Sequence, residues 1–178
     1  MKINFLRNIF QDYVDEFREV IRPVVLNKRV QAMRDFEHHG DICCFAHCLR
    51  VAKHSYSICR ALGLDSQSAA RGAMLHDFFL YDRYEKGVRP VAHLLRHPLA
   101  ALDEASVTFD LNKTEMNIIK AHMWPLSLSR PKYAESIIVS FVDKYIAFKE
   151  YSLLQAQALR RLAVSAGRAV FHRKSTAS

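Results

Sequence analysis

A histidine and an aspartate lie side by side in an otherwise apolar stretch of the chain, residues 73–79 (AMLHDFF). Burying an unpaired carboxylate costs free energy, and a buried imidazole also needs polar partners. His76 and Asp77 therefore require compensation, either from hydrogen bonds or from a cation. A cation bound there would need further ligands from elsewhere in the chain.

Three other polar residues interrupt apolar helical patterns. His47 lies in the middle of one predicted helix, and His122 lies in the last turn of another. Asp143 lies within residues 137–148 (IIVSFVDKYIAF), on a helix face whose other members are mostly small. That face carries no cation to pair with the carboxylate, so a metal ion is the simplest partner.

Imidazole and carboxylate ligands together are typical of Mn, Fe, Ni, Co or Zn sites. A competing interpretation is a structural zinc site formed by Cys43, Cys44, His47 and Cys48. Structural zinc usually takes its ligand pairs from separate segments, and these four residues belong to one segment. The cysteines are therefore predicted to be reduced thiols that fill space in the core.

The chain is predicted to be all-α and to form one domain. Glycine and proline occur only five times each in 178 residues, and half of the residues are apolar. Apolar residues three, four and seven positions apart predict helices, which proline and polar turns divide. The expected ranges are 3–21, 24–36, 41–63, 65–77, 98–109, 112–125, 133–151 and 153–171.

Some details of this organisation bear on the site. Residues 1–36 are predicted to cover a core formed by residues 37–151, and residues 152–178 to add a last helix and a frayed basic tail. Asp41 is expected to cap the helix that carries His47, and Pro98 to begin a helix with His97 just before it. Residues 81–90 are polar and are predicted to form a loop beside the His-Asp pair.

The formal net charge of +8 favours encounters with anionic ligands such as phosphates. The Lys and Arg residues are spread along the chain, which argues against a nucleic-acid-binding stripe. No stretch approaches the ~20 apolar residues of a membrane span, so no membrane partner is expected. The acidic residues soon after the start do not fit a signal peptide, and the reduced cysteines fit the cytoplasm. A homo-oligomer is left open.

The order of these residues resembles the HD superfamily of metal-dependent phosphohydrolases. The resemblance is carried by His47, by the dipeptide His76-Asp77 and by a late Asp143 in an apolar helix, and it covers roughly residues 38–150. It is HDIG-like, and it implies a single-domain helical bundle of the HD type. It also implies one divalent ion held by His47, His76, Asp77 and Asp143.

Two further histidines lie where HD proteins with two metals, including the HD-GYP phosphodiesterases, have extra ligands. The resemblance therefore implies a second ion held by His97 and His122, with Asp77 bridging the two ions. His93, one turn before His97, is an alternative ligand. The sequence lacks the Gly-Tyr-Pro motif of the HD-GYP proteins, which argues against cyclic-di-GMP as the substrate.

The predicted function is metal-dependent hydrolysis of a phosphate ester or nucleotide, as a monoesterase or a diesterase, by metal-activated water. His76 and Asp77 are the expected catalytic centre, Asp82 is expected to protonate a leaving oxygen, and Arg83 and Lys144 are expected to bind phosphate. One alternative is a non-catalytic HD module that binds a nucleotide or a protein. Another is a basic helical protein that binds nucleic acid.

Overall fold

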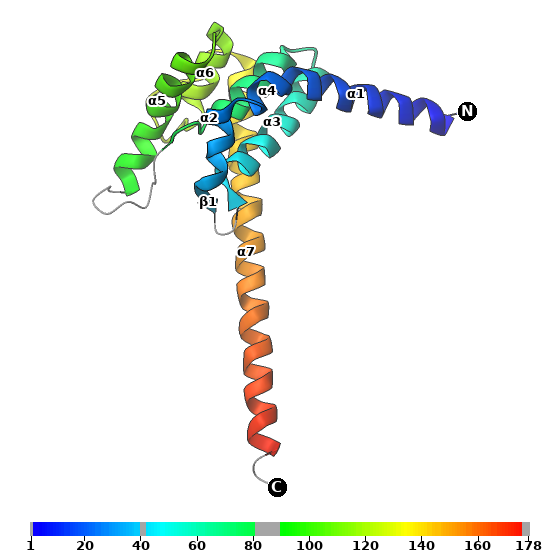
Figure 1. The fold of residues 1–178 in the computed structure, drawn as a ribbon, viewed down its shortest axis with the longest axis vertical. Coiled ribbons are helices and arrows are strands. Elements are labelled where there is room, and N and C mark those ends of the chain that lie inside the picture. The colour runs from blue at the N-terminus through cyan, green and yellow to red at the C-terminus, as the bar shows by residue number, and fades with distance from the viewer. Residues whose placement is uncertain (1, 40–41, 81–89, 176–178) are drawn as a thin grey trace.

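The computed structural model describes residues 2–39, 42–80 and 90–175, and over these ranges the chain is almost entirely helical (Figure 1). This confirms the predicted all-α class. Two very short strands, β1 and β2, pair antiparallel, with Glu37 opposite Cys43. The elements in chain order are α1 (Lys2–Val25), α2 (Lys28–Gln31), the 3₁₀ helix η1 (Ala32–Asp35), β1 (Glu37–His39), β2 (Ile42–Cys43), α3 (Cys44–Ala61), α4 (Ser66–Leu75), α5 (Pro90–Thr108), α6 (Lys113–Ala121) and α7 (Ala134–Ser175).

Helix α4 lies at the centre of the packing, because small side chains let its neighbours approach closely. Ala69, Ala70 and Ala73 are fully buried in it. A Cβ atom added to Gly72 would lie 3.0 Å from three side-chain atoms of Ile118 in α6. Only glycine fits there without a shift, so the close approach of α4 and α6 depends on Gly72. His76 and His122 follow directly after these two helices.

Two helices begin where they were predicted to begin, near residues 65 and 112, and both starts have polar caps. Asp65 accepts a hydrogen bond from the Ser68 backbone N–H at 2.9 Å at the start of α4. Asn112 and Glu115 form a reciprocal capping box at the start of α6, with N–H to oxygen distances of 2.9 and 3.0 Å. These caps satisfy backbone donors that would otherwise lack partners, and they fix where each helix begins.

Two predicted breaks at proline are wrong. Helix α1 continues through Pro23 to Val25, and α5 contains Pro98, so His97 lies inside a helix and not before one. A proline inside a helix removes one backbone hydrogen bond without necessarily ending the helix. In α1 the helix stops two residues later anyway, which limits the loss.

The segment after α1 also differs from the prediction. The expected helix over residues 24–36 is replaced by the short α2 and η1. The two strands that follow were not expected, and α3 begins at Cys44 with Cys43 as its cap residue. Asp41, the predicted cap, lies outside the described residues. The division of the domain into cover, core and tail stays a prediction.

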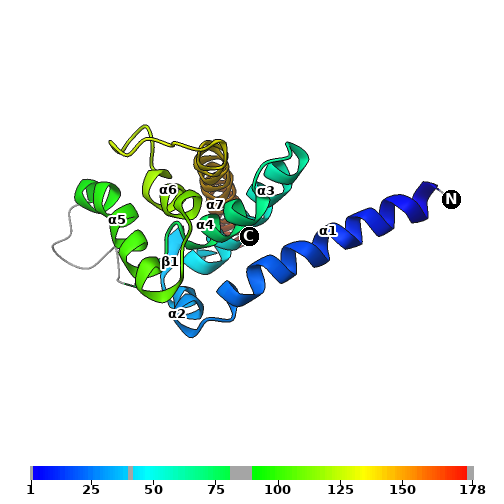
Figure 2. The same cartoon turned by 90° about the horizontal axis from the view of Figure 1, so that it is seen from above.

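Helix α7 is one continuous helix, where two helices had been predicted. No glycine or proline occurs between its start and Gly167. Ser152 at the expected break donates its hydroxyl to the Phe148 carbonyl at 2.8 Å, so it is accommodated within the helix. The second half of α7 leaves the packed helices, and the N-terminal end of α1 also extends outward (Figures 1 and 2). None of the described helices has the length and hydrophobicity needed to cross a bilayer.

Candidate metal centre

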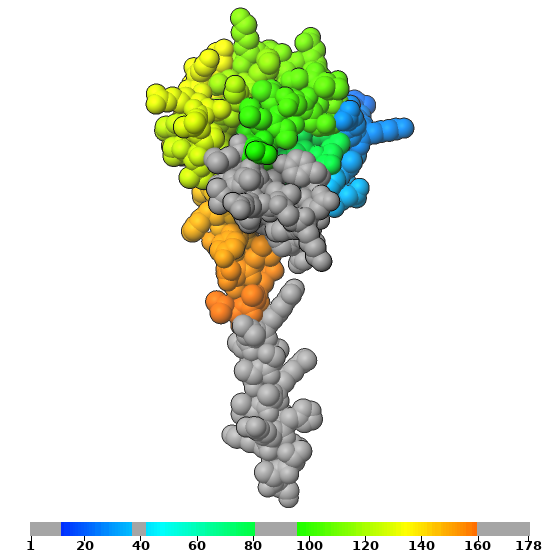
Figure 3. All heavy atoms as spheres, turned by 90° about the vertical axis from the view of Figure 1, so that its left-hand side faces the viewer, coloured from blue at the N-terminus to red at the C-terminus, as the bar shows by residue number. Residues whose placement is uncertain are grey.

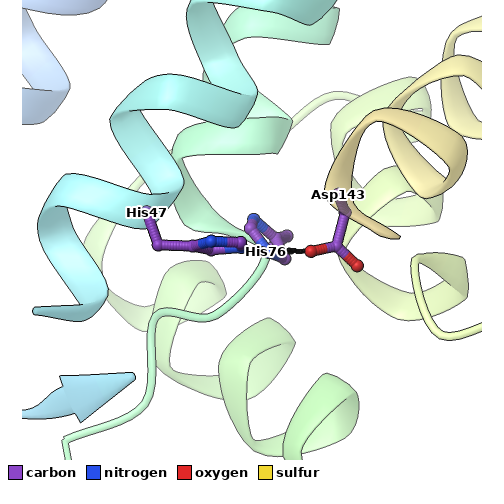
Figure 4. A group of neighbouring side chains, drawn as sticks. All are labelled: His47, His76 and Asp143. Carbon is purple, nitrogen blue, oxygen red and sulfur yellow. Dashed lines mark hydrogen bonds and ion pairs between the residues drawn. The ribbon is translucent and has the colours of Figure 1, made fainter. Parts of the chain in front are cut away.

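Six predicted ligands come together in the interior from five parts of the fold. His47 lies in α3, His76 and Asp77 follow α4, His97 lies in α5, His122 follows α6 and Asp143 lies in α7. Their relative exposures run from 0 to 8%, so all six are buried. Figure 4 shows His47, His76 and Asp143 converging from separate elements.

The first group of candidate ligands is His47, His76 and Asp143, whose ligand atoms all lie within 4.8 Å of one another. His47 Nε2 is 3.1 Å from Asp143 Oδ1, and His76 Nε2 is 3.5 Å from the same oxygen. His76 Nδ1–H donates to the Ala73 carbonyl at 2.7 Å. That bond turns Nε2 of His76 toward the carboxylates and leaves it available as a ligand.

The second group is His76, Asp77 and His122, and His97 adjoins it. Asp77 Oδ1 lies 3.3 Å from His97 Nε2 and 3.5 Å from His122 Nε2, and Asp77 Oδ2 lies 3.5 Å from His76 Nε2. Asp77 thus has one oxygen toward His97 and His122 and the other toward His76. Its carboxylate occupies the boundary between the two groups.

The contacts of His122 define its tautomer. Its Nδ1–H donates to the Ile119 carbonyl at 2.8 Å, so in the neutral ring Nε2 is the acceptor. His97 Nε2 is 2.8 Å from that atom and therefore donates to it. The same lone pair of His122 Nε2 could instead bind a metal ion.

The histidines nearest the carboxylates hold protons strongly. Burial opposes the charged form of His47, but hydrogen bonds to Asp143 and Glu150 outweigh it and raise the pKa to about 9. Burial likewise opposes the charged form of His76, but the charge of Asp77 and the contact with Asp143 raise its pKa to about 9. Burial and the neighbouring His76 lower the pKa of His122 to about 3.

The pKa of Asp143 is shifted in the opposite direction, by the same contacts. Burial raises the pKa of its carboxyl group, but the hydrogen bond from His47 and the positive charge of nearby His76 more than reverse this, and the pKa falls well below its ordinary value. The interior therefore contains anionic carboxylates that are neutralised by protons on two imidazoles. A divalent cation could replace those protons, because neutral imidazole and carboxylate are metal ligands.

The donor set fits a divalent transition metal. Nε2 of His76 is buried and makes no hydrogen bond within the described part of the chain. The oxygens nearest to it, at 3.5 Å, lie beyond normal hydrogen-bond distance. A buried ring nitrogen pointed at two carboxylates is expected of a ligand. The ligands are nitrogen and oxygen atoms, as Mn, Fe, Ni, Co and Zn accept.

The metal-free protein is expected to lose stability at alkaline pH. Because the folded pKa of His47 and His76 is about 9, above the ordinary 6.5, their stabilisation is complete below pH 6.5 and is lost as pH rises through 9. Each 1 kcal/mol lost corresponds to a fall in Tm of about 2–4 °C for a chain of this size. Thermal unfolding in EDTA at pH 6.5 and 9.5 measures it. Saturating Ni²⁺ should reduce the fall, and a Tm that is constant or rises with pH would contradict the assignment.

Burial along α7 agrees with the sequence reasoning about Asp143. Ser136, Val139 and Ser140 on the same face are buried, whereas Phe141 and Phe148 are exposed. All four cysteines are free thiols. Among the described residues, the groups able to hold a metal contain no cysteine, so the structural-zinc alternative gains no support.

Lys144 lies next to Asp143 but is turned to the backbone. Its Nζ donates to the His122 carbonyl at 2.7 Å and to Ser140 O and Oγ at 3.0 and 2.9 Å. Burial lowers its pKa. Its expected role in phosphate binding stays a prediction. Asp82 and Arg83 lie outside the described residues, as does the side chain of His93.

Sequence reasoning missed Glu150 and Arg50. Glu150 Oε2 accepts a hydrogen bond from His47 Nδ1 at 2.9 Å, and Arg50 pairs with Glu150 Oε1 at 2.6 Å. Glu150 is only 4% exposed, and these contacts lower its pKa against the effect of burial. The available signal was spacing: Glu150 follows Asp143 by seven residues, nearly two helical turns, and so lies on the same face.

Comparison with known proteins identifies one family. Residues 44–147, more than half of the chain, match the family model described as HD domain. The match begins at the first residue of α3 and ends four residues after Asp143, so it contains the six candidate ligands. No curated protein and no solved structure matched the chain.

Proposed function

Because the chain belongs to the HD domain family, whose members are typically metal-dependent phosphohydrolases, we propose that it hydrolyses a phosphate ester or a nucleotide. The observation that carries the proposal is that two buried groups of candidate ligands share His76. The first is His47, His76 and Asp143; the second is His76, Asp77 and His122, with His97 beside Asp77. A fold alone would not require this set, since buried ionisable groups cost free energy unless they are compensated.

We assign His47, His76, Asp77 and Asp143 to one divalent ion, and His97, His122 and Asp77 to a second. Such ions supply Lewis acidity, which lowers the pKa of a bound water molecule and polarises a phosphoryl oxygen. The chain itself supplies the geometry. The carbonyls of Ala73 and Ile119 fix the ring orientations of His76 and His122, at 2.7 and 2.8 Å.

Charge balance supports an anionic substrate. Two carboxylates, Asp77 and Asp143, cannot neutralise two divalent ions, and neutral imidazoles add no negative charge. The loaded site would therefore stay positive and attract phosphate. The ligands are 0–8% exposed, and low solvent access strengthens electrostatic stabilisation of charge that develops on a phosphoryl group.

The remaining roles follow from position in the chain and from contacts. Asp82 and Arg83 come shortly after the His-Asp pair, and we keep them as the candidates for protonating the leaving oxygen and binding phosphate. For Lys144 the hydrogen bonds to the His122 carbonyl and to Ser140 favour a positioning role. It ties the end of α6 to α7 and so holds His122 beside Asp77.

The test combines metal analysis with hydrolysis assays. The purified protein is expected to retain a transition metal. It should hydrolyse p-nitrophenyl phosphate, its bis-ester or a member of a nucleotide panel when supplied with Mn, Fe, Ni, Co or Zn, and EDTA should abolish turnover. Metal binding without turnover of any of these would favour the non-catalytic binding module. A protein that binds no transition metal would refute the proposal.

A further inference from the structure

Large apolar side chains are exposed along the outer face of α7, four of them in consecutive turns and one about three turns further on. We call this set, Ile137, Phe141, Tyr145, Phe148 and Leu159, the α7 stripe. Their relative exposures are 44, 62, 60, 72 and 65%. At about 100° per residue, all five fall within about 80° of the helix circumference. Spacings of four and three residues are those of a seam between two helices.

The stripe exposes a larger apolar area than scattered surface residues do. An aromatic side chain offers about 150–250 Å² when fully covered, so the exposed parts of these five residues present about 500–600 Å². Patches of that size on monomers are often interaction sites. An interface of standard size needs about 800 Å² on each partner. The stripe would supply most of it, and the residues that border it could supply the rest.

Residues 151–159 of α7 also have little cover from the described part of the chain. Residues 151–159 are exposed except for Leu154, which is half-buried, and this part of α7 emerges below the packed helices (Figure 3). Helices in proteins take most of their stability from packing of an apolar face. Within the residues whose burial is described, Glu150 is the last buried one in α7, and the helix continues beyond it with Leu159 of the stripe exposed. This part of α7 is therefore expected to meet another surface.

We propose that the α7 stripe is a homodimer interface in which two copies of α7 pack antiparallel about a two-fold axis near Tyr145. In this arrangement Phe141 lies level with the partner's Phe148, so the two aromatic pairs repeat by symmetry, as an isologous contact requires.

A cavity at the N-terminal end of the stripe supports the antiparallel direction. It measures about 390 Å³ and is lined by Trp124, Arg130, Pro131, Ile137 and Phe141. In an antiparallel dimer, residues 151 and 152 of the partner lie opposite Ile137. The exposed side chain of the partner's Tyr151 would therefore reach the cavity. A parallel partner would bring Ile137 itself to that level and leave the cavity open.

Sedimentation equilibrium tests the dimer. The wild-type protein is expected to have twice the chain mass of 20.5 kDa. The double substitution Phe141→Glu with Phe148→Glu should weaken association by at least about 30-fold per residue. Val107→Glu and Leu128→Glu are matched controls, because these residues are 80 and 100% exposed but lie outside the stripe. Circular dichroism checks that the stripe variant remains folded. A monomeric wild type, or a folded stripe variant that remains dimeric, would overturn the proposal.

Cross-linking tests the direction of packing. Phe141→Cys and Phe148→Cys are made separately with different affinity tags, in a background where half-buried Cys43 is replaced by serine; the other three cysteines are buried. Antiparallel packing predicts a disulfide between the two variants when they are mixed and little disulfide in either alone. Efficient cross-linking of each variant with itself would show parallel packing and refute the antiparallel dimer.

Discussion

Replacing Asp77 by asparagine is expected to lower hydrolytic turnover by more than about 100-fold, which is the largest loss typical of removing a residue that only orients a metal ligand. Asn has nearly the same shape but no charge, and one of its two positions becomes an amide nitrogen that cannot bind a cation. Asp77 Oδ1 faces His97 and His122 at 3.3 and 3.5 Å, and Oδ2 faces His76 at 3.5 Å. Under the proposed assignment, one substitution therefore removes a ligand of both ions.

Metal content separates this effect from general damage. The Asp77→Asn protein should bind less metal, measured by mass spectrometry after dialysis, and its turnover should not recover at high metal concentration. Asp110→Asn is the matched control, because Asp110 is exposed and should keep wild-type turnover and metal content. Undiminished turnover of Asp77→Asn would refute the role of this carboxylate.

The candidate ligands were predictable because each of them breaks a pattern. A histidine or aspartate on the apolar face of a helix must be compensated, and this identified His47, His122 and Asp143 before any contact was known. Apolar periodicity reports burial, and all three are buried. His97 was also expected near the site, but the predicted start of its helix was wrong, because the helix does not begin at Pro98.

Features that arise from the packing of several helices were harder to predict from the sequence. Glu150 lies in the sequence KEYS, where charged and polar neighbours resemble solvated surface. Its burial arises only because α7 packs beside α3, which brings it to His47 and Arg50. The continuity of α7 was missed for a related reason. A polar residue such as Ser152 suggests a boundary, but local propensity alone does not end a helix whose backbone bonds are satisfied.

The contacts of Glu150 lead to the second large effect. By accepting a hydrogen bond from His47 Nδ1 at 2.9 Å, Glu150 keeps that proton in place and directs Nε2 toward Asp143, 3.1 Å away. Arg50 holds the other carboxylate oxygen at 2.6 Å. Glu150 is therefore proposed as a positioning residue for the candidate ligand His47. It also makes Nε2 of His47 a stronger electron-pair donor to a metal ion, because the carboxylate balances positive charge on the ring.

Glu150→Gln is therefore expected to weaken metal affinity by about 10–100-fold, measured by calorimetric titration of the metal-free protein. Glutamine retains an acceptor for His47 Nδ1–H but loses the charge and the ion pair with Arg50. Glu135→Gln is the matched control: Glu135 is also buried in α7, but it accepts from the Asp65 backbone N–H at 3.0 Å, at the start of α4. Both variants should unfold at lower temperature, since each loses a buried charge with its partners. Only Glu150→Gln should change metal affinity. If both variants bound metal like wild type, Glu150 would serve stability alone.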